Sequence, residues 1–295
     1  MKNLKQFADI LSLGNQYQKK EYLQSIFSEY QTIEDEYGNF YVSRDFSKIQ
    51  PFVCSHIDTV AESDDSKTII YDSVSGILTA ERNGKQCNLG ADDGVGIWAC
   101  ISIFKDYDVG LAFFLDEEVG CLGSASADPN ILKNASYLIQ LDRKGNEDIV
   151  FKTSFIDISS NSFIKDINPI IAKHGYSSAI GGMTDVVTLV ERNIVSVAAC
   201  NISCGYYNPH KKDEYIIIKD MLKAISLAKD IISSLGNVVY EHVFEDNYFD
   251  FECDDYYLNN FQNGTMTLKS YLMELAQSDL DDDTIIEKIY TEILC

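Results

Sequence analysis

Short apolar runs of strand length, separated by segments with a helical period, are the feature that most constrains the fold of this chain. An unbroken apolar run is typical of a strand that is buried on both faces of a parallel sheet. Such runs occupy residues 51–55, 111–115, 137–141 and 194–199, and a helical period is clear over residues 219–235. This alternation predicts an α/β fold, a three-layer α/β/α sandwich with a mostly parallel central sheet.

Smaller elements are predicted on either side of the first apolar strand. A helical period over residues 1–35 is broken near Gly14 and resumes as a second helix near residues 21–30. Residues 68–76 and 77–88 have the pattern of β-ribbons, and an Asn-Gly pair in the second of them indicates a hairpin turn.

The charge balance excludes several classes of partner. Lys and Arg number 24 against 46 Asp and Glu, so the formal net charge is −22. Such a charge repels nucleic acid and anionic membranes, and neither is expected as a partner. No apolar stretch approaches the roughly 20 residues of a membrane helix, and Asp9 interrupts the place where a signal peptide would sit. A cytoplasmic protein with reduced cysteines is therefore expected.

The composition changes at about residue 241, which predicts two regions. Residues 1–240 hold the strands and helices described above and are predicted to form one domain. Residues 241–295 contain 14 acidic side chains and 2 lysines. Because this acidic extension also carries several Tyr and Phe side chains, it is predicted to be folded.

Acidic and histidine side chains stand where the apolar strands stop. In an α/β sheet the carboxyl ends of the parallel strands line the crevice that holds ligands, so these side chains are expected to converge. The segments are V-C-S-H-I-D-T-V, L-G-A-D-D-G-V-G, F-F-L-D-E-E-V-G, L-I-Q-L-D-R-K-G and Y-Y-N-P-H-K-K-D-E-Y, and they hold His56, Asp58, Asp92, Glu117, Glu118, Asp142 and His210.

The residue types at these strand ends favour a pair of divalent cations. Two imidazoles and three carboxylates suit ions such as Zn²⁺, and Mn²⁺ or Co²⁺ also bind mixed nitrogen and oxygen sites. In two-metal hydrolysis the ions lie about 3.5–4 Å apart, so one carboxylate bridges them while another stays free to move protons. Four carboxylates then balance two divalent ions, whereas without metal the clustered anions repel each other.

The order of these segments resembles that of the co-catalytic dizinc metallopeptidases, a family that includes peptidase T-like tripeptidases and dizinc aminopeptidases without a lid domain. The resemblance rests on H-x-D, G-A-D-D-x-x-G, D-E-E-V-G and H-x-x-x-E, and it covers roughly residues 1–235. The element G-G-M-T-D at residues 181–185 is similar to the G-G-T-D element of the peptidase T branch, with one inserted Met. The resemblance implies the same α/β fold, two bound metal ions and the hydrolysis of peptides.

The resemblance also implies a role for each side chain. Glu117 would act first as general base and then as general acid. Asp58 would orient the imidazole of His56. Asp92 would be followed by a cis peptide bond to Asp93. The implied metal ligands are His56 and Asp142 for the first ion, Glu118 and His210 for the second ion, and Asp92 as the bridge between them.

The chain departs from the tripeptidase branch in two ways. That branch inserts a lid domain between the Asp ligand and the final His, but only 68 residues separate Asp142 from His210 here. That interval must already supply strands and a helix, and a folded domain needs at least ~50 residues of its own, so the lid is predicted to be absent. A lid-mediated dimer is then not expected, and the oligomeric state is left open. Ala179 and Ile180 stand where that branch has an Arg, so recognition of a substrate's C-terminal carboxylate is not carried over.

Three functions are open from the sequence. The expected one is a metal-dependent exopeptidase, an aminopeptidase that hydrolyses short peptides, because an acidic site suits a free ammonium group. The same site would serve an amidohydrolase or deacylase that acts on N-acyl amino acids. The third is a non-catalytic binding protein that acts through the acidic extension at residues 241–295.

Four polar side chains outside the implied ligand set have structural interpretations. Asp93 is either part of the site or an acid in the first turn of a helix. Asp116 either supports the site or faces solvent. His174 and His242 match no motif, and both are predicted to be structural.

Overall fold

A central sheet of eight strands organises the computed structural model, which describes residues 2–60 and 67–244. Across the sheet the strands are β1 (Gln31–Glu34), β2 (Phe40–Ser43), β7 (Gly110–Phe114), β3 (Gln50–His56), β8 (Ala135–Arg143), β11 (Ala199–Ser203), β9 (Asp148–Thr153) and β10 (Ser177–Gly181). The pairs β7–β3, β3–β8, β8–β11 and β9–β10 are parallel, whereas β1–β2, β2–β7 and β9–β11 are antiparallel. The predicted mostly parallel sheet is therefore confirmed.

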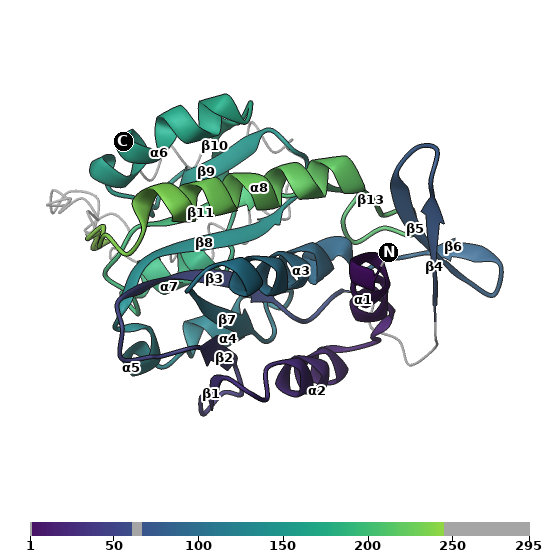
Figure 1. Ribbon diagram of the computed structural model, residues 1–295, viewed down its shortest axis with the longest axis horizontal. Helices are drawn as coiled ribbons and strands as arrows, with labels where there is room; N and C mark the ends of the chain where they lie inside the picture. The colour runs from purple at the N-terminus through teal and green to yellow at the C-terminus, as the bar shows by residue number, and fades with distance from the viewer. Residues whose placement is uncertain (1, 61–66, 245–295) are drawn as a thin grey trace, which may run out of the picture. The chain divides into compact units, whose positions relative to one another are not determined.

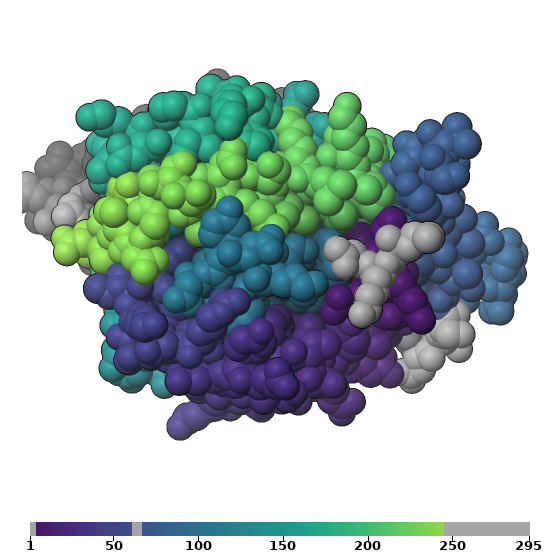
Figure 2. All heavy atoms as spheres, in the orientation of Figure 1, coloured from purple at the N-terminus to yellow at the C-terminus, as the bar shows by residue number. Residues whose placement is uncertain are grey.

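Helices cover both faces of this sheet (Figure 1). One face carries α1 (Lys2–Ser12), α2 (Gln16–Ile26), α3 (Ala91–Asp106), α6 (Asn161–Lys173) and α8 (Ile218–Leu235). The other face carries α4 (Leu122–Ala125), α5 (Pro129–Leu132) and α7 (Asp185–Glu191). Figure 2 shows α3, α6 and α8 closing over the near face. This arrangement confirms the predicted three-layer α/β/α sandwich.

The direction of successive side chains explains why the central strands are apolar throughout. Neighbouring residues of a strand point to opposite faces of its sheet. On β3, Val53 packs in the core that includes α3 and α8, whereas Phe52 and Cys54 pack in the core that includes α7. All three side chains are buried, so the apolar run reflects helices on both faces.

A second, smaller sheet lies beside the central one. Its strands are β12 (Tyr206–Tyr207), β13 (Tyr215–Ile217), β5 (Ile77–Arg82) and β4 (Thr68–Asp72) in that order, and β6 (Lys85–Cys87) also pairs with β5. In Figure 1, β4, β5 and β6 stand together at the right beyond α1. The Asn83–Gly84 pair links β5 to β6 with both residues at positive φ, which confirms the predicted hairpin.

The second predicted helix has different bounds in the structure. It spans Gln16–Ile26 instead of residues 21–30, because the side chain of Asn15 accepts hydrogen bonds from two N–H groups of the first turn. Residues 31–34 form β1, so the prediction that the helical period continues to residue 35 is wrong.

The predicted strand at residues 194–199 also has wrong bounds. β11 begins only at Ala199, and the preceding residues leave the end of α7, with two N–H groups bonded to the carbonyl of Leu189. Val195 and Val197 are buried in the core that includes α7. Val197 forms an isolated antiparallel bridge to Glu241, so the apolar character of this segment reflects burial of a connection more than strand pairing.

The interval between Asp142 and His210 is occupied by elements of the two sheets and their helices. It holds β9, α6, β10, α7, β11 and β12, and each of these strands pairs within one of the two sheets. From residue 245 onward, the predicted acidic extension lies outside the described residues. Among the helices of the described part of the chain, none is long and apolar enough to cross a membrane.

Candidate metal centre

The structure brings together the seven acidic and histidine side chains that the sequence places at the strand ends. Parallel strands end at one edge of the sheet, so residues that are far apart in the sequence meet there. His56 ends β3, Asp58 follows it, Glu117 and Glu118 follow β7, Asp142 lies near the end of β8, Asp92 lies at the start of α3, and His210 lies between β12 and β13.

The two carboxylate oxygens of Asp92 face two different histidines. Oδ1 lies 3.0 Å from Nε2 of His56, and Oδ2 lies 3.2 Å from Nε2 of His210. A carboxylate that presents one oxygen to each side has the arrangement that a bridging ligand needs. The peptide bond from Asp92 to Asp93 is cis, as the resemblance implies.

Two groups of possible ligand atoms share Asp92. His56, Asp92 and Asp142 form one group, Asp92, Glu118 and His210 form the other, and the atoms of each group lie within 4.8 Å of one another. Nε2 of His56 is 3.7 Å from Oδ1 of Asp142, and Nε2 of His210 is 3.1 Å from Oε2 of Glu118. Oε1 of Glu118 is buried without a hydrogen-bond partner among the described residues. This donor set, with one unpartnered buried oxygen, fits a pair of divalent cations.

Asp58 connects His56 to the turn that carries Glu117 and Glu118. Its Oδ1 lies 3.0 Å from Nδ1 of His56 and accepts a hydrogen bond from the N–H of Glu117 at 3.1 Å. Its Oδ2 accepts the N–H of Glu118 at 3.0 Å. The contact at Nδ1 leaves Nε2 of His56 directed at the two carboxylates of its group.

Glu117 lies beside both groups but has a different environment. One oxygen of its carboxylate lies within 4.8 Å of a ring nitrogen of His56 and a carboxylate oxygen of Glu118. Its Oε1 accepts a hydrogen bond from the thiol of Cys121 at 3.6 Å. Burial raises the pKa of Glu117, and the charge of Asp92 raises it further against the opposing effect of His56. A carboxylate whose pKa is raised towards neutrality is suited to accept and return a proton.

The carboxylates hold their histidines in the protonated form when no metal is bound. Burial lowers the pKa of His56, but hydrogen bonds to three carboxylates outweigh it and raise that pKa well above 6.5. A hydrogen bond to Asp92 raises the pKa of His210 to about 9. Burial raises the pKa of Glu118 to about 7. Metal ligands have to be unprotonated, so cations and protons compete for this site.

We expect the stability of the metal-free protein to fall as the pH rises. The pKa of folded His210 is about 9 against an ordinary 6.5, so its contribution is complete below pH 6.5 and lost towards pH 9. The pKa of folded Glu118 is about 7 against 4.5, so the folded state again binds more protons and loses stability from pH 4.5 to pH 7. Solvent reduces the contribution of His210 to the free energy of unfolding, because its side chain is 47% exposed.

Metal binding has the opposite pH dependence, because it releases these protons. Thermal unfolding at about pH 6 and about pH 9, with a chelator and with Zn²⁺, measures both trends. At each pH, the midpoint with Zn²⁺ is compared with the midpoint with the chelator. The difference between them should be larger at about pH 9 than at about pH 6. A difference that stays constant would contradict the proton competition.

Asp142 has three supporting side chains that the sequence motifs do not identify. Nε2 of Gln140 donates to its Oδ2 at 3.0 Å, and the hydroxyl of Tyr206 donates to its Oδ1 at 3.3 Å. The side chain of Asn201 bonds to both the N–H and the carbonyl of Asp142. Gln140 also donates to the buried Asp185 at 3.3 Å. Only strand alternation indicates Gln140 in advance, since it shares a face of β8 with Asp142.

Asp116 has side-chain partners of its own and does not simply face solvent. Its Oδ1 accepts a hydrogen bond from Nε2 of Gln16 at 2.7 Å, and its Oδ2 accepts one from the hydroxyl of Tyr37 at 2.8 Å. Asp116 has a φ of 54°, which is uncommon for a residue with a side chain. These bonds hold the turn that leads from β7 to Glu117.

The remaining polar side chains with structural interpretations have local partners. Oδ1 of Asp93 accepts the N–H of Gly96 at 2.8 Å in the first turn of α3, and Oδ2 accepts the hydroxyl of Ser55 at 2.8 Å. His174 contacts an aspartate at 2.9 Å, and His242 contacts a backbone carbonyl at 2.7 Å. The structural interpretation of these three residues agrees with their contacts.

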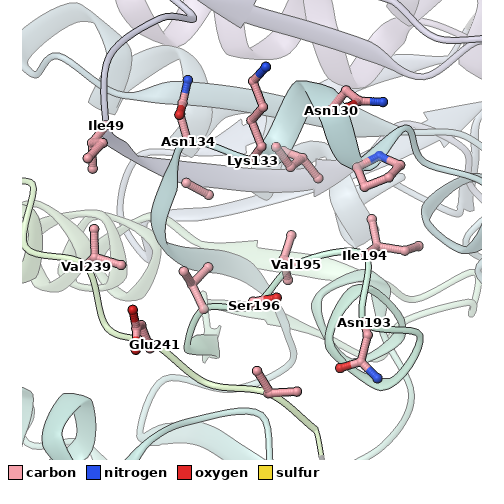
Figure 3. A pocket seen from close by; sticks show the side chains of 15 residues that line it. Ile49, Asn130, Lys133, Asn134, Asn193, Ile194, Val195, Ser196, Val239 and Glu241 are labelled. Atoms are coloured by element: carbon pink, nitrogen blue, oxygen red, sulfur yellow. The ribbon is translucent and has the colours of Figure 1, made fainter.

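Two cavities differ in their relation to the cluster. One of about 250 Å³ opens beside Asp142, and its lining includes Val150, Met183 and Tyr206. The other, of about 710 Å³, has Ile49 and Val195 in its wall and lies where β3, β8 and β11 begin (Figure 3). Parallel strands end at the opposite edge, so only the smaller cavity adjoins the candidate metal centre.

This chain is similar to solved protein structures, but its sequence matches neither a family model nor a curated protein. No protein-family model matches this chain, and no curated protein matches its sequence. Aminopeptidase PepT from Bacillus cereus is similar with a TM-score of 0.61 and 14% identity, over 79% of this chain and 98% of that one. A tripeptidase from Staphylococcus aureus gives a TM-score of 0.61 and 14% identity, over 78% and 96% of the two chains.

An archaeal structure extends the likeness. The TET aminopeptidase from a marine sediment Thaumarchaeota archaeon has a TM-score of 0.60 and 12% identity, over 80% of this chain and 98% of that one. At such low identity the likeness shows the fold alone. The chain therefore has the α/β fold of these aminopeptidases, which is the fold that its resemblance to the dizinc metallopeptidases implies.

Proposed function

We propose that this chain is a cytoplasmic metal-dependent exopeptidase, an aminopeptidase that hydrolyses short peptides. The observation that carries the proposal is Asp92, whose two oxygens lie 3.0 and 3.2 Å from His56 and His210. So many carboxylates in one place are unfavourable unless cations or protons offset their charge. The fold shared with solved aminopeptidases supports the same function.

The proposed cofactors are two divalent cations. The ligand types favour Zn²⁺, with Mn²⁺ and Co²⁺ as alternatives. When bound, such a pair lowers the pKa of a coordinated water and polarises the substrate carbonyl. The residues that would hold the two ions are His56 and Asp142 on one side, Glu118 and His210 on the other, and Asp92 between them.

Glu117 and Asp58 supply the protein's part of the proposed reaction. Glu117 accepts a proton from the attacking water and then donates it to the leaving amine. Asp58 holds His56 through Nδ1 and holds Glu117 through its backbone N–H. One carboxylate therefore fixes a metal ligand and the proton carrier relative to each other.

The proposed substrate is a short peptide with a free amino terminus. Beyond the four carboxylates that two divalent ions would balance, Asp58 and Glu214 add negative charge beside the ligands, which favours a charged ammonium group over a neutral N-acyl group. The cavity of about 250 Å³ beside Asp142 is the proposed place for a substrate side chain, and its lining combines apolar Val150 and Met183 with the charged side chains of Arg143 and Lys144.

Matched substrates test this function. Each of a set of dipeptides and tripeptides is offered with a free and with an acetylated amino terminus, and kcat/KM is measured with Zn²⁺ present. We expect the free-amine peptides to react faster by ~10-fold or more, a difference of about 1.4 kcal/mol in the barrier. Glu117→Gln, purified identically, controls for contaminating peptidases.

The same assay separates the alternatives. Turnover of the acetylated set alone would replace the aminopeptidase by a deacylase. Two bound ions with no turnover of either set would favour a binding protein, whose proposed surface beyond residue 244 lies outside the described residues.

A further inference from the structure

A buried carboxylate holds the backbone that leads into Asp92. Glu214 is fully buried, and its Oε2 accepts hydrogen bonds from the N–H groups of Gly90 and Ala91 at 2.7 and 3.2 Å. Its Oε1 accepts the N–H of Asp92 itself at 3.3 Å. Three consecutive N–H groups form a concave site that suits an anion, and they offset the cost of burying this charge.

A lysine holds the same loop from its other side. Nζ of Lys67 donates to the carbonyl of Leu89 at 2.7 Å and lies 3.4 Å from the carbonyl of Asn88. Gly90 has a φ of +70°, and a Cβ atom there would lie 3.2 Å from this Nζ. Glycine at residue 90 therefore allows both the turn and the close approach of the lysine.

Both charged residues lie next to strands of the smaller sheet. Lys67 directly precedes β4, and Glu214 directly precedes β13. Glu214 also follows His210 by four residues, so the segment that carries this candidate ligand is anchored to the backbone of Asp92. The bonds between Glu214 and the loop join positions 122–124 residues apart in the sequence.

We propose that Glu214 and Lys67 are positioning residues, through which the smaller sheet sets the distance between Asp92 and His210 for binding of divalent cations. The inference rests on the proposed function and assigns to that site a structural support outside the ligand set. Side chains that fix metal ligands from outside typically change metal affinity by ~10–100-fold when they are replaced.

Glu214→Gln tests the carboxylate with little change of volume. An amide has a single acceptor oxygen, and its NH₂ group would face the N–H groups that the carboxylate satisfies. We expect the Zn²⁺ dissociation constant, measured by competition with a chromophoric chelator, to rise by ~10–100-fold. Lys67→Met is expected to act in the same direction. Glu81→Gln on β5 and Lys85→Met on β6, both at exposed positions of the same sheet, are the matched controls and should leave the affinity unchanged.

Three readouts separate positioning from a loss of fold. The metal-free variant should still unfold in one cooperative transition, at a midpoint lowered only by the hydrogen bonds that Glu214 loses. Lost kcat should return when the Zn²⁺ concentration is raised, with KM little changed. The visible spectrum of Co²⁺-loaded Glu214→Gln should differ from that of Co²⁺-loaded wild type. If Glu214→Gln does not fold, Glu214→Asp, which keeps the charge but shortens its reach, should weaken Zn²⁺ binding in folded protein.

The outcomes also distinguish this inference from the proposed function. Wild-type affinity in Glu214→Gln, or a loss of kcat that excess Zn²⁺ does not restore, would overturn the positioning role and leave the metallopeptidase proposal standing. A wild-type chain that binds no divalent cation would overturn the proposed function, and the inference with it.

Discussion

Replacing Glu117 by Gln is expected to lower kcat by ~10²–10⁴-fold, the usual contribution of a general acid–base group. Glutamine has nearly the same size and keeps the backbone N–H that bonds to Asp58 at 3.1 Å. It cannot accept a proton from water at the pH of the assay. The same preparation should retain both metal ions, because Glu117 is not among the proposed ligands.

A loss of kcat with both metal ions retained would assign Glu117 to proton transfer and not to metal binding. Glu147→Gln, at an exposed position, makes the same chemical change away from the cluster and should leave kcat unaltered. Steady-state kinetics on a free-amine dipeptide, with metal analysis of the same sample, gives both quantities. Unchanged turnover in Glu117→Gln would exclude it as the proton carrier. A loss of metal would indicate that it is a ligand.

Replacing Asp92 by Asn is expected to abolish turnover and to remove at least one metal ion. Both oxygens of Asp92 face a histidine, so one substitution weakens both ligand groups at once. The affinity for Zn²⁺ should fall by more than ~10–100-fold, which is the typical loss when a residue that only holds a metal ligand in place is replaced. Calorimetric titration with Zn²⁺, together with kcat, measures the effect.

Two controls show whether the effect of Asp92→Asn comes from lost metal binding or from unfolding. Asp9→Asn in α1 makes the same change at an exposed position and should keep two ions and full activity. The metal-free unfolding midpoint of Asp92→Asn shows whether the fold survives. Two tightly bound ions in a folded Asp92→Asn variant would rule out the bridging role.

The layers and the convergence of the cluster were predictable because they follow from local patterns. Apolar runs such as residues 111–115 are unbroken because helices cover both faces of the sheet, and the carboxyl ends of such strands share one edge. That geometry brings His56 to Asp142, within 3.7 Å. No single motif predicts that these side chains converge, but the order of the motifs along the chain does.

The errors in element bounds have physical causes that hydrophobic periodicity does not contain. The cap at Asn15 starts the second helix early through side-chain hydrogen bonds. At residues 194–198 a buried connection has the composition of a strand, because burial and strand pairing both favour apolar side chains.

The supporting residues of the site depend on contacts that sequence order cannot reveal. Gln140 lies two residues before Asp142, yet its second partner, Asp185, is 45 residues away. Glu214 belongs to the H-x-x-x-E motif, but its partner is a backbone loop on another element. Such residues become identifiable only when the fold places both partners together.

Five side chains, His56, Asp92, Glu118, Asp142 and His210, form the proposed site for two cations, with Glu117 free beside it. Elemental analysis of wild-type protein, saturated with Zn²⁺ and dialysed, tests it most directly. We expect two ions per chain and a lower unfolding midpoint after chelation, because a ligand that binds only the folded state stabilises it. No bound ion, or an unfolding midpoint that does not respond to chelation, would contradict it.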